Sequence, residues 1–164
     1  MKKTALGLLI VLFIGILAGC GSTVEQDALI SYLNEDIPSV MDIESKVTEG
    51  WEAVSGDNYT SDDAMYQALT DGIIPDSLDL VAAAEAVTVE DEGIKTAHEL
   101  YISAVNKQHQ AFNLIMSAIE QQDSAKISEA NALLAEARKE VRDFLAQIEQ
   151  LKTDRNVVTA SEDE

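Results

Sequence analysis

Few residue types able to do covalent, metal or acid–base chemistry occur in this chain of 164 residues, and they lie far apart. The single cysteine is Cys20, in the stretch LAGCGS, and the two histidines are His98 and His109. A thiolate is a strong nucleophile, whereas a histidine binds metals or moves protons near neutral pH. Cys20 directly follows an apolar run, so its chemistry belongs to the N-terminal segment.

Residues 1–19 have the features of a secretory signal peptide. Lys2 and Lys3 give a positive start, the apolar run ALGLLIVLFIGI follows, and small residues precede Cys20. The run is short for a membrane-spanning helix, which needs roughly 20 apolar residues. The alternative is an ordinary signal peptide, or a short membrane helix, with an incidental cysteine.

The stretch Leu17-Ala18-Gly19-Cys20 closely resembles the lipobox of bacterial lipoproteins, in which a leucine and two small residues precede the cysteine. This resemblance covers about the first twenty residues. It implies cleavage between Gly19 and Cys20 and a diacylglycerol, with palmitate-type chains, joined to the Cys20 sulfur by a thioether. Two acyl chains suffice for stable anchoring, at roughly 0.8 kcal/mol for each buried methylene. We therefore expect a lipid-anchored protein on the extracytoplasmic side of the cell membrane.

The histidines and acidic stretches do not form a recognisable metal site. A di-iron bundle needs Glu-x-x-His on two helices, but Lys95 and Asn106 lie three residues before His98 and His109. Eleven residues of helix separate the two histidines by about 16 Å, too far for one ion, so surface or boundary positions are expected. The stretch DNYTSDD, residues 57–63, lacks the alternating ligands and central glycine of a calcium-binding EF-hand loop. We predict no metal and no cofactor.

Catalytic motifs are also missing from the sequence. It has no Gly-x-Ser-x-Gly elbow and no phosphate-binding glycine loop, and its scattered carboxylates cannot be paired from sequence alone. We therefore expect no enzymatic activity. Gln108 interrupts an apolar stripe close to Tyr101 and His98, and these three residues form the candidate polar core or pocket. A polar residue in such a stripe either specifies helix register or lines a small ligand cavity.

Charge is distributed unevenly along the chain. Loss of Lys2 and Lys3 with the signal peptide would change the formal charge from −19 to −21. Residues 20–94 carry 18 acidic residues and one base, whereas residues 95–164 carry 12 acidic residues and eight bases. This balance argues against nucleic acid as a partner, because its binders need a basic stripe. It also argues against adsorption to anionic lipid head groups.

Two long helices are predicted in the second half of the chain. In each, apolar residues recur at alternating steps of three and four, with Gln108 as the one polar interruption. Thr88 to Asp91 resemble a capping box before the first of them, and Asp123 or Ser124 can cap the second. The short connection between the two makes them antiparallel. Their stripes are Ile94, Ala97, Tyr101, Ala104, Gln108, Ala111, Ile115 and Ala118, and Ile127, Ala130, Leu134, Ala137, Val141, Phe144, Ile148 and Leu151.

The first half predicts two bent helices. Residues 24–54 contain Pro38, which predicts a kink or break near Asp36, and the segment that starts at Thr60 or Ser61 is interrupted at Gly72 and Pro75. The fold class expected is all-α, an up-down-up-down four-helix bundle with two proline-bent helices. The domains expected are a signal peptide (1–19), a lipidated tether (20–23), a helical bundle domain (24–153) and an acidic disordered tail (154–164).

The function predicted is a non-catalytic binding or structural module on the cell envelope. Beyond the lipobox, the chain is similar in pattern to small helical-bundle lipoproteins of Gram-positive bacteria, with no functional motif to transfer. The alternative is a ligand-binding accessory lipoprotein of a transporter or enzyme. Bases of the last helix are expected to pair with acids of the first. The acids of the second segment are then left to attract a basic envelope protein as partner.

Overall fold

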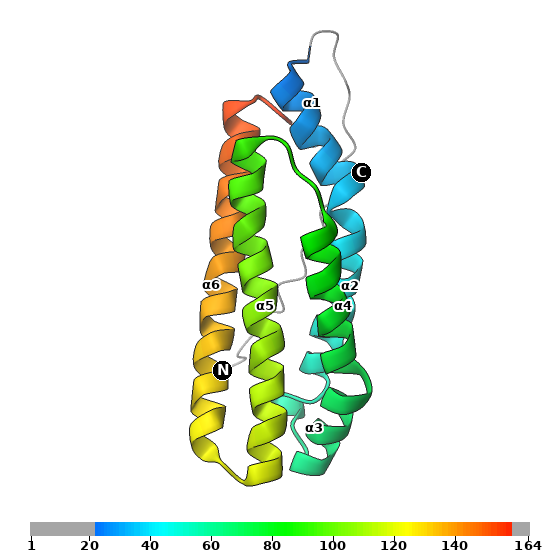
Figure 1. The fold of residues 1–164 in the computed structure, drawn as a ribbon, viewed down its shortest axis with the longest axis vertical. Helices are drawn as coiled ribbons and strands as arrows, with labels where there is room; N and C mark the ends of the chain where they lie inside the picture. The colour runs from blue at the N-terminus through cyan, green and yellow to red at the C-terminus, as the bar shows by residue number, and fades with distance from the viewer. Residues whose placement is uncertain (1–21, 159–164) are drawn as a thin grey trace.

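The computed structural model describes residues 22–158, and Gly19 and Cys20, on which the anchor prediction depends, lie outside them. The described chain is all-α, as predicted, and contains no strand in this range. Figure 1 shows the helices running lengthwise along an elongated, bundle-like body. The elements are α1 (Val24–Ser31), η1 (Tyr32–Asp36), α2 (Pro38–Glu52), η2 (Gly56–Asn58), α3 (Asp62–Ala68), η3 (Leu69–Ile73), α4 (Ile74–Ala86), α5 (Glu92–Gln121) and α6 (Ser124–Asp154).

The two prolines sit in the same local geometry. Pro38 and Pro75 lie in the first turns of α2 and α4, and each follows a π-helical turn, η1 or η3. In both, the residue before the proline donates its N–H five residues back: Ile37 to Tyr32, and Ile74 to Leu69. A proline ring clashes with the carbonyl of the preceding helical turn, and a wider turn relieves this clash. The predicted interruptions are therefore π turns, through which α1 continues into α2 and α3 into α4.

Of the helix N-caps predicted from the sequence, those of α3 and α6 are confirmed and that of α5 is wrong. Ser61 caps α3 by accepting from the Ala64 N–H, and Asp123 caps α6, both as expected. The cap predicted at Thr88 is wrong, because α5 begins three residues later, where Asp91 accepts from the Ile94 N–H at 3.0 Å. The Asp91 carboxylate accepts this N–H and also pairs with Arg155 at the end of α6. A threonine hydroxyl carries no charge and could not form such an ion pair.

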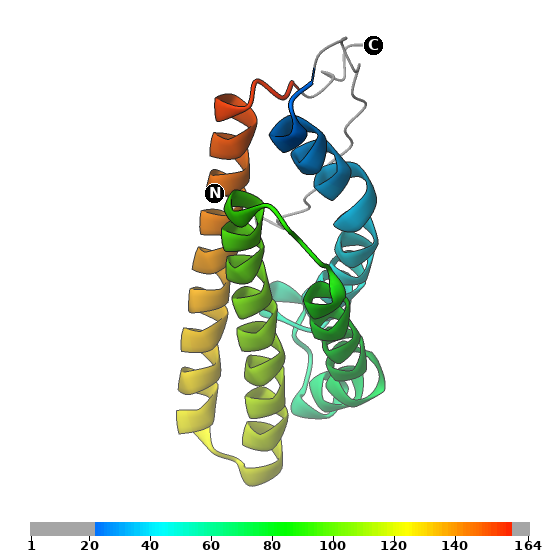
Figure 2. The ribbon, with the colours of Figure 1, turned by 45° about the horizontal axis from the view of Figure 1, so that its top comes forward.

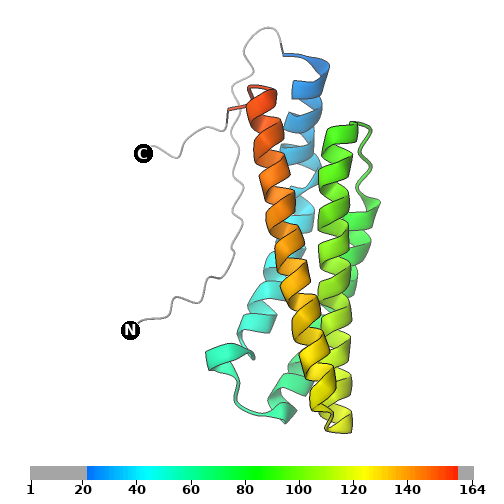
Figure 3. The ribbon, with the colours of Figure 1, turned by 90° about the vertical axis from the view of Figure 1, so that its left-hand side faces the viewer.

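The helices pack as two neighbouring pairs joined through α4 and α5. Figures 1 and 2 show α5 and α6 side by side along their whole length, with α2 and α4 forming the other side. The α5 stripe is buried as predicted, except for half-buried Gln108. Most of the α6 stripe is buried too, but Ile127 near its start is exposed. In Figure 3 the α1–α2 rod passes behind α6, and the turn that follows α2 lies apart from the start of α6.

The end of α6 is tied to the start of the described chain. The Arg155 guanidinium lies 2.8 Å from the Asp91 carboxylate and donates to the Glu25 carbonyl at 2.8 Å. Burial tends to raise the pKa of Asp91, but Arg155 and the Ile94 N–H outweigh it and hold that pKa below its usual range. Val157 is only 8% exposed. The tail predicted from residue 154 thus has packed residues as far as 157, and residues 159–164 lie outside the described range.

The ion pairs expected between bases of α6 and acids of α2 do not occur within residues 22–158. Lys139 and Lys152 pair along α6 itself, with Asp143 and Glu149. The prediction was wrong because α2 and α6 diverge, so that few of their residues approach each other. No helix of the described chain has the length and apolar character needed to cross a bilayer.

Candidate functional site

The divergence of α2 from α6 opens a groove of about 330 Å³, and we call it the α2–α6 groove. Helix α5 lies beneath it, between the two walls. Ligand pockets in proteins commonly have volumes of about 300–1,000 Å³, so this groove suits a small ligand. Its lining consists of Glu44, Thr48, Trp51, Glu52 and Ser55 from α2 and the turn after it, Ala104, Val105 and Gln108 from α5, and Leu134, Ala137, Arg138, Val141 and Arg142 from α6.

Glu44 and Glu52 are the carboxylates of the α2 wall, and Glu44 is the less exposed of the two. The Tyr101 hydroxyl donates to Oε2 of Glu44 at 3.0 Å, and Tyr101 itself is fully buried in the core beside Phe144. Burial raises the pKa of Glu44, although the Tyr101 hydrogen bond acts in the opposite direction. Within the described chain, no lysine, arginine or histidine lies within 4 Å of this carboxylate. Glu44 is thus a partly desolvated carboxyl group, held in one orientation and lacking a cationic partner in the described chain.

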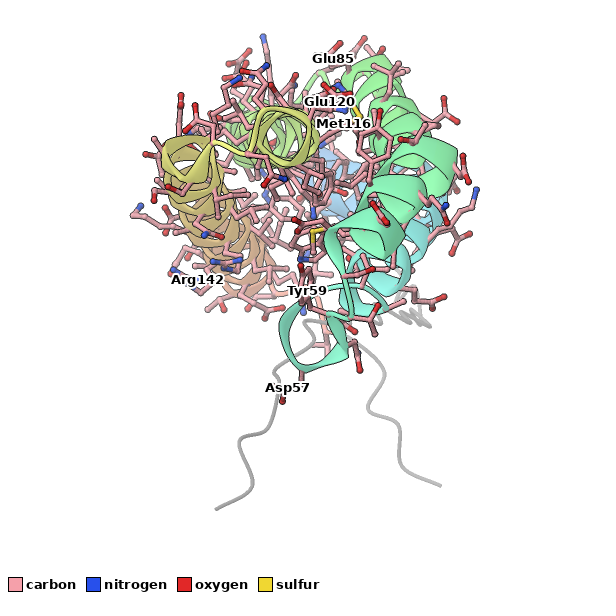
Figure 4. All side chains as sticks on the ribbon, turned by 90° about the horizontal axis from the view of Figure 1, so that it is seen from below. Asp57, Tyr59, Glu85, Met116, Glu120 and Arg142 are labelled. Carbon is pink, nitrogen blue, oxygen red and sulfur yellow. The ribbon has the colours of Figure 1, made fainter. Side chains whose placement is uncertain are left out.

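Arg138 and Arg142 form the opposite wall, one turn apart on α6. Neither makes a side-chain hydrogen bond or ion pair with any group from residue 22 to 158. Figure 4 shows Arg142 on the side of the molecule that also carries the loop with Asp57 and Tyr59. A guanidinium offers five N–H donors in a planar fork that matches a carboxylate or phosphate. This wall is therefore able to receive an anion.

Trp51 supplies an aromatic surface at the end of the α2 wall. Its ring packs against Phe112 of α5, with ring centroids 5.2 Å apart, while part of the side chain remains accessible. The floor below it is formed by Ala104 and Val105, both buried. The groove therefore has an acidic and aromatic wall, an apolar floor and a basic wall.

His98 is buried, at 3% exposure, so the predicted surface or boundary position is wrong. Its Nε2–H donates to the Ala84 carbonyl at 2.8 Å, and its Nδ1 accepts from the Tyr32 hydroxyl at 2.9 Å. Burial lowers the pKa of His98, which favours the neutral ring that this bonding pattern requires. The imidazole is a second donor to the Ala84 carbonyl at the C-terminal end of α4, which also accepts from the Val87 N–H at 3.3 Å. His98 is a structural link between three helices.

His109 is likewise bonded at both ring nitrogens. Its Nδ1 lies 2.8 Å from the Ser77 hydroxyl, which itself donates to the Ile74 carbonyl, so this nitrogen carries the proton. Asn113 lies 3.1 Å from Nε2. Burial lowers the pKa of His109 as well. Residues 22–158 contain no group of three or more histidine, cysteine, aspartate or glutamate side chains arranged to hold a metal ion.

The predicted polar site is divided by the structure. Gln108 lines the α2–α6 groove, and Tyr101 reaches it through Glu44, but His98 bonds elsewhere although its ring stacks on Tyr101 at 6.2 Å. Sequence reasoning missed Glu44. It occupies the stripe position between Val40 and Val47, four residues after one and three before the other, where an apolar residue is expected.

Polar residues at stripe positions on two helices, Glu44 on α2 and Gln108 on α5, were the available signal for a groove between them. The two arginines gave no such signal, because they flank the α6 stripe, where exposed bases are ordinary. No protein-family model, curated protein or solved structure matches this chain.

Proposed function

We propose that this protein is a lipid-anchored module of the cell envelope that binds a ligand without catalysing its conversion, and that the α2–α6 groove is its binding site. The observation that carries this proposal is the pair of facing walls, on which Glu44, Arg138 and Arg142 lack partners of opposite charge in the described chain. Glu44 is partly buried, whereas Arg138 and Arg142 are exposed, so only the Glu44 carboxylate bears a desolvation cost that a cationic group of a ligand would offset. The two arginines remain free to contact an anionic group.

The groove favours a ligand-binding accessory protein over a purely structural module. A purely structural module needs outer faces that are complementary to its partner proteins. A recess of about 330 Å³ with polar groups on both walls is instead typical of a small-molecule site. Any transporter or enzyme that the protein serves would then meet another surface. The exposed acids Asp71 of η3 and Asp79 of α4 are suited to attract a basic partner. The neighbouring Asp76 already forms an ion pair with Lys46, at 2.7 Å.

We infer further that the helices constitute an up-down-up-down four-helix bundle. The four legs are the α1–α2 rod, the α3–α4 rod, α5 and α6. Support comes from the antiparallel α5 and α6, joined by only Gln122 and Asp123, and from the contacts of α4 with both α2 and α5. The divergence of α2 and α6 leaves the fourth side of this bundle partly open, and the groove lies on that side.

The proposed anchor is the diacylglycerol on Cys20. Replacing Cys20 by Ala should abolish labelling of the protein with a fatty-acid probe, block lipoprotein-type cleavage and prevent membrane attachment of the mature chain. Fractionation and probe labelling of cells that produce each form provide the measurement. Equal labelling of the two forms would show that the lipobox interpretation is wrong.

The groove can be tested in membranes of producing cells with a photo-crosslinking amino acid. Placed at Thr48, in the groove, it should give ultraviolet-dependent adducts detectable by mass spectrometry of the protein. Placed at Lys95, an exposed position on α5 outside the groove, it should give few. Adducts that are no more frequent at position 48 than at position 95 would refute a binding function for the groove.

A further inference from the structure

We propose that the α2–α6 groove binds a short zwitterionic molecule, with its ammonium group against Glu44 and Trp51 and its carboxylate against Arg138 and Arg142. This inference rests on the proposed binding function and specifies the chemical class of the ligand. The class meant is a free amino acid or a short peptide with both ends free. It follows from the charge of each wall, the floor between them and the size of the recess.

The α2 wall is suited to an ammonium group. Tyr101 occupies Oε2 of Glu44, which fixes the carboxylate and leaves its other oxygen without a hydrogen-bond partner in the described chain. Trp51 lines the same wall, and the face of an indole ring attracts a cation electrostatically. An ammonium that contacts both groups would compensate the Glu44 carboxylate for the hydration that burial removes. An anionic group of a ligand would be repelled from this wall by Glu44 and by the neighbouring Glu52.

The α6 wall is suited to a carboxylate. Arg138 and Arg142 are one helical turn apart, so the two guanidinium groups can approach one anion from adjacent positions. Arginine–carboxylate contacts are often bidentate and are among the strongest hydrogen bonds in proteins. The chain carries a formal charge of −19, so two unpaired arginines on one side of a recess are a local exception to its acidity.

The floor and the volume limit the length of the ligand. Ala104 and Val105 form an apolar surface between the charged walls, which fits an aliphatic side chain. A volume of about 330 Å³ lies near the lower end of the range of about 300–1,000 Å³ found for small-molecule sites. An amino acid, dipeptide or tripeptide is of this size, whereas a folded protein segment is much larger. Opposite charges on facing walls also favour a molecule with two charged ends over a simple anion or cation.

The experiment is a titration of the full chain, purified in a non-ionic detergent, followed by tryptophan emission. Trp51 is the sole tryptophan of the protein and lines the groove, so the signal reports the site directly. The probes are leucine, alanyl-leucine and alanyl-alanyl-leucine, which present the same charged ends at increasing separation. For each peptide, an N-acetylated form removes the ammonium and an amidated form removes the carboxylate. At least one zwitterionic probe should bind saturably, and each blocked form of it should bind at least about tenfold more weakly, a loss of about 1.4 kcal/mol.

Two groove variants assign each end of the ligand to a wall. Glu44→Gln keeps a hydrogen-bond acceptor for Tyr101 and removes the charge. It should weaken the zwitterionic probe about tenfold while leaving the affinity of the N-acetylated form unchanged. Arg138→Gln combined with Arg142→Gln should do the same for the carboxylate, leaving the amidated form unchanged. Glu49→Gln and Lys139→Gln are matched controls on the same two helices outside the groove and should bind as wild type does. Circular dichroism checks that every variant is folded.

The outcomes separate this inference from the proposed function. If no zwitterionic probe alters Trp51 emission, or if the N-acetylated and unblocked forms bind equally, a zwitterionic ligand is ruled out. Crosslinked adducts at Thr48 would then still support a groove that binds something else. If the adducts are also missing, both proposals fail together. Equal loss of every probe in Glu44→Gln would show that this residue shapes the groove without contacting an ammonium, and would overturn the proposed orientation.

Discussion

The hydrogen bond between Tyr32 of η1 and His98 of α5 joins two residues that are 66 positions apart in sequence. Replacing Tyr32 by Phe removes the hydroxyl and conserves almost all of the ring volume, so packing in the core should change little. The variant leaves Nδ1 of His98 as a buried acceptor without a donor. This loss should appear as reduced stability, while the helical content stays the same.

The magnitude follows from burial. Tyr32 is 1% exposed and His98 is 3% exposed, so water cannot replace the missing partner without opening the core. An unsatisfied buried polar atom costs about 1–3 kcal/mol. The free energy of unfolding of Tyr32→Phe should therefore fall by about that amount. His98→Leu removes the other partner and also a bond to the Ala84 carbonyl, so it should cost at least as much.

Urea unfolding, followed by circular dichroism and Trp51 emission, measures these differences. The double variant should be less destabilised than the sum of the two single variants, because the orphaned partner left by each single change is then absent. Additive effects would show that the two side chains do not depend on each other. A Tyr32→Phe variant as stable as wild type would contradict the bonding assigned to His98.

The same residue predicts a pH dependence. Burial lowers the pKa of His98 and of His109 in the folded protein, so the unfolded chain takes up protons first as the pH falls. Stability should therefore decrease below about pH 6.5, by up to about 1.4 kcal/mol per pH unit for each histidine, until the folded-state pKa is reached. Glu44, with a raised pKa, has the opposite sign, since its stabilising contribution is lost as the pH rises above 4.5 and through its folded-state pKa. In His98→Leu only the contribution of position 98 disappears, so the slope below pH 6.5 should become shallower. An unchanged slope would refute a neutral buried imidazole.

Two further substitutions test the packing. Leu134→Asp would place an unpaired charge at a buried stripe position of α6 and should lower the free energy of unfolding by several kcal/mol. Glu129→Ala, on the exposed face of the same helix, should change the free energy of unfolding by less than about 0.5 kcal/mol. Equal effects of the two substitutions would contradict the assigned helix faces. Arg155→Ala removes the partly buried pair with Asp91 and should cost about 1–3 kcal/mol in urea unfolding, with little dependence on salt. A salt-sensitive loss of a few tenths of a kcal/mol would instead indicate an ordinary surface pair.

Local features of the fold could be predicted from the sequence because they depend on neighbours within about five residues. The start of α3 at Ser61, the start of α6 after Asp123 and the interruptions before Pro38 and Pro75 are of this kind. A cap needs one side chain and a backbone N–H two or three residues away, and a proline excludes its own helical bond wherever it lies. The buried face of α5 was also predictable, since its spacing follows the helical repeat.

Tertiary structure decided the features that join distant segments. The single-helix pattern placed His98 at the surface or boundary, because the two groups that satisfy its nitrogens belong to other helices. It left Glu44 without a role, because the hydroxyl that holds it comes from Tyr101, 57 residues later. The angle between α2 and α6 had no local signal either, since it results from how α2 packs on α4 and how α6 packs on α5. That angle opens the groove and separates the acids of α2 from the bases of α6. The sequence determined which charged residues the helices carry. Only the packing of the helices decided that these residues face each other unpaired across a recess.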